Sequence, residues 1–156
     1  MEQDYELRIN AALGRILRNF NFLELNLGLC LRLLENPDKP GELYDYLRNT
    51  GIAKIIKRLQ RVLGECEHIS DTSKYDEWME EVDRIRLLRN FYVHATWEYL
   101  PLRHDAPLGF RVPPWKEELI DGKCQGKMTI EDLEEEANSV ETVFDNFMAI
   151  RKSYGV

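Results

Sequence analysis

The stretch RINAALGRILRNFNFLELNLGLCLRLLE, residues 8–35, decides the fold because its large apolar residues recur at the spacing of an α-helix. One apolar stripe comprises Leu13, Leu17, Phe20, Leu27, Leu31 and Leu34, and a second comprises Ile9, Ala12, Ile16, Leu23, Cys30 and Leu33. A helix that is apolar on two faces is buried between neighbouring helices or in an oligomer. The pattern predicts a helix from about Asp4 to Glu35, which the turn-forming residues 36–41 (NPDKPG) end.

Similar patterns predict the remaining helices. We expect a short helix over about residues 42–48, one from about Ile52 to Cys66, one that Ser73 caps and that ends near His94, and a last one that starts at Thr129. Residues 96–128 differ, since they hold four of the six prolines and alternate apolar with polar side chains. The sequence therefore predicts an all-α, up-and-down bundle of four or five helices with a short β-hairpin insertion before the last helix.

Length and composition limit the class of protein. A chain of 156 residues favours a single domain over 1–156, with 96–128 as an insertion. Three widely spaced cysteines argue for a reducing compartment. The acidic start MEQDYELR is not typical of a signal peptide, and the longest apolar run, LGLCLRLL, is too short to cross a membrane. We expect a cytoplasmic protein without a cofactor. No metal site is expected either, since Cys66 and His68 lack a second ligand pair at zinc spacing.

Charge is unevenly distributed along the chain. The net charge of −7 weakens a nucleic-acid-binding interpretation, but residues 84–104 carry four arginines against the single acid Glu98. Four more cations recur at helical spacing on one face of the helix that follows residue 51: Lys54, Lys57, Arg58 and Arg61. This face is either an ordinary solvated surface or a surface that binds the RNA backbone.

The stretch RNFYVH, residues 89–94, is the candidate catalytic motif. Arg89 can bind a phosphate bidentately, Asn90 can orient groups by hydrogen bonding, and His94 can move a proton near neutral pH. Arg89 and His94 diverge by roughly 140° on a helix, so two copies facing each other across a two-fold axis would form a shared cleft. Such a cleft suits cleavage of RNA by its own 2′-hydroxyl without a metal.

Two further charged residues are candidates for supporting this motif. Glu24 lies within an apolar stripe and needs a partner, so it either forms a structural ion pair with Arg89 or Arg86 or orients the motif. Arg86, one turn before Asn90, either extends the phosphate site or pairs with a neighbouring acid of its own helix.

RNFYVH also resembles the R-x4-6-H motif of the HEPN superfamily, in which a polar residue, often Asn, follows the Arg. FNFLELNLGLCLRLLE, residues 20–35, is similar to the first helix of small bacterial and phage members. The resemblance implies a helical bundle that forms a homodimer with the motif helices facing each other. Many members are metal-independent endoribonucleases of toxin–antitoxin systems, phage defence or RNA processing, while others are catalytically inactive binding or scaffold modules.

The resemblance also implies the partners, which are RNA and an antitoxin or another protein from a neighbouring gene. One branch of the superfamily is controlled by an antitoxin that modifies a tyrosine two residues after the motif His. That position is Thr96 in this chain, which departs from the branch.

Overall fold

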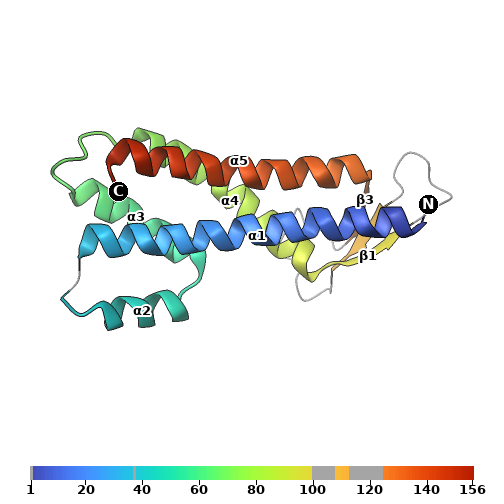
Figure 1. Ribbon diagram of the computed structural model, residues 1–156, viewed down its shortest axis with the longest axis horizontal. Helices are drawn as coiled ribbons and strands as arrows, with labels where there is room; N and C mark the ends of the chain where they lie inside the picture. The colour runs from blue at the N-terminus through green and yellow to red at the C-terminus, as the bar shows by residue number, and fades with distance from the viewer. Residues whose placement is uncertain (1, 37, 100–107, 113–124) are drawn as a thin grey trace. The chain divides into compact units, whose positions relative to one another are not determined.

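The computed structural model describes residues 2–36, 38–99, 108–112 and 125–156 (Figure 1). The helices are α1 (Glu2–Glu35), α2 (Pro40–Asn49), α3 (Ile52–Glu65), α4 (Ser73–His94) and α5 (Ile130–Tyr154). The strands are β1 (Thr96–Tyr99), β2 (Leu108–Arg111) and β3 (Gln125–Met128). The predicted architecture, a helical bundle with a β insertion before the last helix, is confirmed. No helix in these ranges is long and apolar enough to pass through a membrane.

Two compact units make up the chain, and each combines segments that are distant in sequence. Unit 1 comprises Met1–Phe20 and Arg84–Thr142, and unit 2 comprises Asn21–Asp83 and Val143–Val156. Helices α1, α4 and α5 each contribute a segment to both units. The division therefore follows no linker, and the expectation of a single domain over 1–156 stays a prediction.

In unit 1, charged side chains join α1 to α5. The Arg8 guanidinium donates two hydrogen bonds to the Glu134 carboxylate, both of 2.8 Å, and Arg15 Nη2 lies 2.9 Å from Glu141 Oε2. Arg15 follows Arg8 by seven residues on α1, and its partner Glu141 follows Glu134 by seven residues on α5. The two helix segments of this unit therefore run in the same direction.

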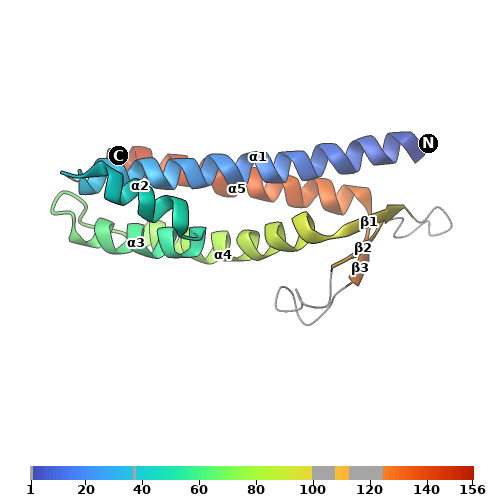
Figure 2. The same cartoon turned by 90° about the horizontal axis from the view of Figure 1, so that it is seen from below.

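The inserted segment forms a three-stranded antiparallel sheet in the order β1-β2-β3 (Figure 2). The predicted hairpin corresponds to β1 and β2, where Trp97 is opposite Phe110. The third strand was not predicted, because its sequence QGKM has little β character. Gly126 lies opposite Phe110, and a Cβ at this position would collide with the Phe110 ring, so a glycine is required there.

Aromatic rings attach this sheet to the end of α4. The Phe91 and Phe110 ring centroids are 5.0 Å apart, and those of Tyr92 and Trp97 are 5.2 Å apart. The Trp97 indole N–H donates to the Tyr92 carbonyl at 3.2 Å, and burial raises the pKa of the Tyr92 hydroxyl. The cluster holds β1 directly after α4, two residues beyond His94.

In unit 2, hydrogen bonds from two aromatic side chains and one ion pair join the helices α1, α3, α4 and α5. The indole N–H of Trp78 (α4) donates to the Val143 carbonyl (α5) at 2.9 Å, and the Tyr75 hydroxyl (α4) donates to the Ile56 carbonyl (α3) at 3.0 Å. Arg58 of α3 donates two hydrogen bonds, of 2.8 and 2.7 Å, to the Glu35 carboxylate at the end of α1.

Two local sequence predictions can be checked against the observed helix ends. The predicted start of the last helix is confirmed: the Thr129 hydroxyl accepts from the Asp132 N–H at 3.0 Å, and the Asp132 carboxylate accepts from the Thr129 N–H at 2.7 Å. The cap of α4 is Thr72 and not Ser73, because the Thr72 carbonyl accepts the N–H groups of Tyr75 and Asp76. Ser73 is the first residue inside the helix.

The two apolar stripes predicted for α1 form a single wide buried face. Its buried side chains include Ile9, Ala12, Ile16, Phe20, Leu23, Leu27, Cys30 and Leu31. Leu33 was expected in this face, but it is 60% exposed because it lies on the opposite side of the helix.

Candidate functional site

The predicted motif occupies the last two turns of α4, in unit 1. Asn90 and His94 are four residues apart and share one face of the helix with Arg86. His94 is exposed, whereas Arg86, Arg89 and Asn90 are half-buried. The local sequence explains these exposures. Leu88, Phe91 and Tyr92 form the buried face of these two turns, so the polar motif residues lie at the edge of that face or on the solvent side of the helix.

Arg89 is held by a neutral partner. Its Nη1 donates to Asn90 Oδ1 at 3.0 Å, and its guanidinium carbon lies 5.5 Å from the centroid of the Phe20 ring. Arg8 and Arg15, on α1 of the same unit, are instead bound by carboxylates. Among the described residues no carboxylate pairs with Arg89.

One further feature of Arg89 departs from ordinary packing. Its Nε is buried and has no acceptor among the described residues. A buried donor without an acceptor costs about 1–3 kcal/mol, and a catalytic role or a bound water or ion are among the explanations for such groups. Asn19 of the same unit is 4% exposed, and its Nδ2 is a second buried donor without an acceptor among the described residues. Both observations favour a functional interpretation of this part of unit 1.

The supporting role predicted for Glu24 is not found. Glu24 is exposed and makes no hydrogen bond or ion pair with any residue in the described ranges. The reason is its position on α1: the buried residues proceed through Phe20, Leu23 and Leu27, and position 24 is rotated away from them. The expectation that Glu24 orients the motif or neutralises Arg89 stays a prediction, since Glu24 belongs to unit 2 and the motif to unit 1.

The basic residues of α3 lie in unit 2 and are only partly available. Arg58 is bound by Glu35 and stacks over the Tyr46 ring at 4.3 Å, and the hydrogen bonds that it donates to Glu35 raise the pKa of Arg58. Arg61 lies 3.9 Å from Glu65 on its own helix. Lys54 and Lys57 are exposed. Arg58 is thus engaged in holding α3 to α1, which interrupts the continuous basic face that the sequence suggested.

Two cations near the motif were missed by sequence reasoning. Arg111 of β2 is the register partner of Thr96, which follows His94 by two residues, and Lys127 of β3 is the partner of Gly109. Both cations are exposed. Successive residues of a strand alternate between the faces of a sheet, so both lie on the face opposite Trp97 and Phe110. The alternation through residues 108–112 was a signal for Arg111, whereas no signal in the sequence pointed to Lys127.

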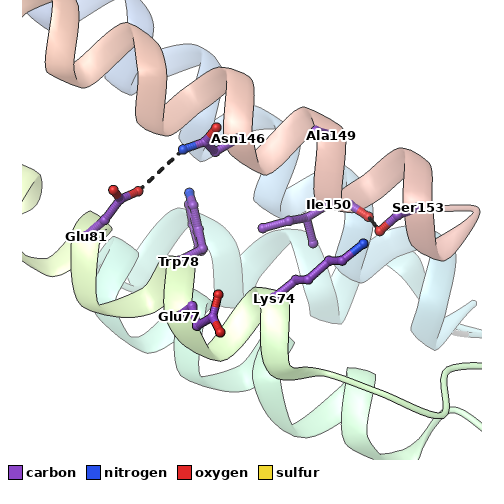
Figure 3. A pocket seen from close by; sticks show the side chains of 8 residues that line it. All are labelled: Lys74, Glu77, Trp78, Glu81, Asn146, Ala149, Ile150 and Ser153. Atoms are coloured by element: carbon purple, nitrogen blue, oxygen red, sulfur yellow. Dashed lines mark hydrogen bonds between the residues drawn. The ribbon is translucent and has the colours of Figure 1, made fainter.

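The motif is not part of the hollow between α4 and α5 in unit 2. That open cavity, of about 430 Å³, is lined by Lys74, Glu77, Trp78, Glu81, Asn146, Ala149, Ile150 and Ser153 (Figure 3). Asn146 Nδ2 donates to Glu81 Oε2 at 3.5 Å across its rim. The candidate site is therefore a surface at the end of α4 and not this cavity.

A metal centre has no support in the described ranges, where no three His, Cys, Asp or Glu side chains are grouped so as to hold an ion. Comparison of the chain with protein-family models, with curated proteins and with solved structures finds no match. The HEPN assignment accordingly remains a prediction that rests on Arg89, Asn90 and His94 and on the pattern of the first helix.

Proposed function

We propose that this protein is a metal-independent endoribonuclease of the HEPN type, acting as a homodimer in a toxin–antitoxin or phage-defence setting. One observation carries the proposal. Arg89 is half-buried, is oriented by Asn90 and has no carboxylate partner among the described residues, and the exposed His94 lies one turn after Asn90 on the same helix. An arginine that is positioned by a neutral amide is suited to bind a phosphate.

Each motif residue has a distinct role in the proposed reaction. His94 removes the proton of the RNA 2′-hydroxyl as a general base, and the 2′ oxygen then bonds to phosphorus. The bond from phosphorus to the 5′ oxygen breaks, and this oxygen takes a proton from the second His94 of the dimer or from water. Arg89 stabilises the charge that builds up on the phosphoryl oxygens, and Asn90 keeps the guanidinium in place. DNA lacks the 2′-hydroxyl and would not be cut.

A homodimer supplies the geometry that one α4 helix lacks. Arg89 and His94 diverge by roughly 140° around the helix axis, so the Arg of one copy and the His of the other converge only when two motif helices face each other. Val93, which is 38% exposed between these residues, offers an apolar contact at the same surface.

Arg111 and Lys127 extend the proposed RNA-binding surface beyond the motif. Arg111 is paired with Thr96, and Thr96 follows His94 by two residues, so Arg111 lies close to the end of the motif helix. Exposed cations on the same sheet face can bind the phosphates on either side of the cleaved one. A local basic surface of this kind is compatible with a net charge of −7 for the whole chain.

The test is incubation of the purified chain with total RNA in the presence of EDTA. The parent protein should cut RNA, and His94→Ala should lower the cleavage rate by at least about 100-fold, as expected for loss of a general base. His68→Ala is the matched control, since His68 is also exposed but lies in unit 2.

Four outcomes would count against the proposal. Undiminished cleavage by His94→Ala would remove His94 from the reaction, and cleavage that EDTA abolishes would require a metal. An RNA substrate with a 2′-deoxy residue at the cut site should resist cleavage, so cutting it would exclude 2′-hydroxyl attack. A parent protein without any cleavage would favour the catalytically inactive HEPN-like binding module.

A further inference from the structure

The outward face of α1 in unit 2 carries a row of large apolar side chains. Phe22, Leu25, Leu29 and Leu33 are 46%, 57%, 46% and 60% exposed. Their spacing of three, four and four residues places them on one side of the helix. The opposite side of the same segment is the buried face described above, so these side chains are not displaced core residues.

The row continues onto α5. The Phe22 and Phe144 ring centroids are 6.2 Å apart, and Met148, one turn beyond Phe144, is 36% exposed. Arg151 Nη1 donates to Asn26 Oδ1 at 2.6 Å and joins the two helix segments beside the row. We call the side chains of this surface the apolar patch: Phe22, Leu25, Leu29, Leu33, Phe144 and Met148.

The size of the apolar patch is that of an interface core. Its exposed side chains offer on the order of 400 Å² of apolar surface, which is about the largest patch that a typical monomer leaves in water. A standard interface buries about 800 Å² per partner, and homodimer interfaces are about 65% apolar. The apolar patch could therefore supply most of the apolar area of one side of a stable dimer.

We propose that the apolar patch is an isologous interface with a second copy of this chain. The row has the symmetry that such a contact requires, because Leu25 and Leu33 each lie one turn from Leu29, on either side of it. Two antiparallel α1 segments on a two-fold axis at Leu29 bring the two Leu29 side chains together, and each Leu25 meets Leu33 of the partner subunit. The row itself contains no charged residue, so this contact brings no like charges together at its centre.

This contact is independent of the nuclease proposal, since it uses none of the motif residues. If the α4 surfaces also pair, the chain assembles beyond a dimer. If the α4 surfaces do not pair, the apolar patch alone gives a dimer. The mass of the assembly and the cleavage of RNA thus report on the two proposals separately.

The first test is the mass of the full chain in solution, measured by sedimentation equilibrium at micromolar concentration. The parent should be a dimer or larger, and Leu29→Glu should halve its mass. Leu7→Glu is the matched control, because Leu7 is a 64%-exposed leucine of the same helix outside the apolar patch. Leu29→Gln replaces the charged variant if that variant does not fold. A monomeric parent, or unchanged mass in the folded Leu29 variant, would overturn the proposal.

A second test addresses the two-fold axis at Leu29. Under mild oxidation Leu29→Cys should form a covalent dimer through residue 29, identified by peptide mass, while Leu7→Cys and the parent should not. The native Cys30 does not interfere, since its thiol is buried and its pKa is raised to about 11. Absence of a cross-link through residue 29 from a dimeric protein would exclude this arrangement of the two helices.

Discussion

The two halves of α1 share an inward face but differ in the chemistry that they turn outward. In unit 1 the arginines Arg8 and Arg15 bind carboxylates of α5, and these side chains remain about one-third exposed. In unit 2 the corresponding surface is the apolar patch, where four leucine or phenylalanine side chains of α1 are about half exposed. Charged side chains that pair at the surface are compatible with water, whereas a continuous apolar row is typical of a surface that another chain covers. One helix can therefore have both a solvated and a contact surface.

The largest expected change in unfolding free energy concerns the buried face that both halves of α1 share. Ile16 in unit 1 and Leu27 in unit 2 are both 0% exposed, so Ile16→Ala and Leu27→Ala should each lower the free energy of unfolding by about 2–5 kcal/mol. Urea denaturation followed by circular dichroism measures both. If one variant were nearly as stable as the parent, the inward face of that half would not be packed as described.

An intermediate change in unfolding free energy is expected for the Glu35–Arg58 ion pair, at the end of the unit 2 half of α1. Glu35 and Arg58 are only 17% and 25% exposed and share two hydrogen bonds, so Glu35→Gln should cost about 1–2 kcal/mol of unfolding free energy. Glu65→Gln is the control, because the Glu65–Arg61 pair is 69% and 66% exposed and its loss should cost less than about 0.5 kcal/mol. Equal costs for the two variants would show that Arg58 does not hold α3 to α1.

The smallest expected effect concerns the pH dependence of the first half. Hydrogen bonds from Arg8 hold the pKa of the Glu134 carboxyl below its ordinary value. A lowered folded-state pKa means that this pair stabilises the fold above about pH 4.3, the ordinary pKa of Glu, and that the stabilisation is lost as the pH falls through the lower folded-state value. Since both side chains are about one-third exposed, solvent screening limits the contribution to about 0.5 kcal/mol.

Glu134→Gln should accordingly lose stability near neutral pH and show a flatter decline on acidification than the parent. The urea midpoint measured from pH 7 to pH 3 tests this expectation. Asn26→Ala, which removes a contact of the second half, is the control, because the Asn26 side chain has no ionisable group. A parent-like slope for Glu134→Gln would assign the acid sensitivity to other carboxylates.

Several elements could be predicted from sequence because their signals are local. The apolar period and the NPDKPG stretch indicated the helix from about residue 4 to residue 35, and α1 is observed at Glu2–Glu35. Thr129 and Asp132 form the cap that starts the last helix, as their spacing suggested. β3 was missed because Gly126 is needed only by the Phe110 ring of another strand, which is not apparent within its own four residues.

In the candidate site, too, the residues with a local sequence signal were identified, and those placed by distant contacts were not. The motif residues Arg89, Asn90 and His94 were identified from sequence, and their placement at the end of α4 follows from the helix pattern. Glu24 was expected within the apolar stripe of the first helix but is exposed, because a stripe of apolar residues does not resolve a rotation of a few tens of degrees. Arg111 was missed as a neighbour of the motif, because its position depends on pairing with Thr96 of another strand.

The amino-acid sequence alone determined the helices, the inserted strands β1 and β2 and the motif, because periodicity, caps and turns act over a few residues. Only the tertiary structure decided which leucines of α1 face outward and which arginines have a carboxylate partner. These outcomes depend on the rotation and register of segments that are distant in sequence, and a shift of one residue reverses them.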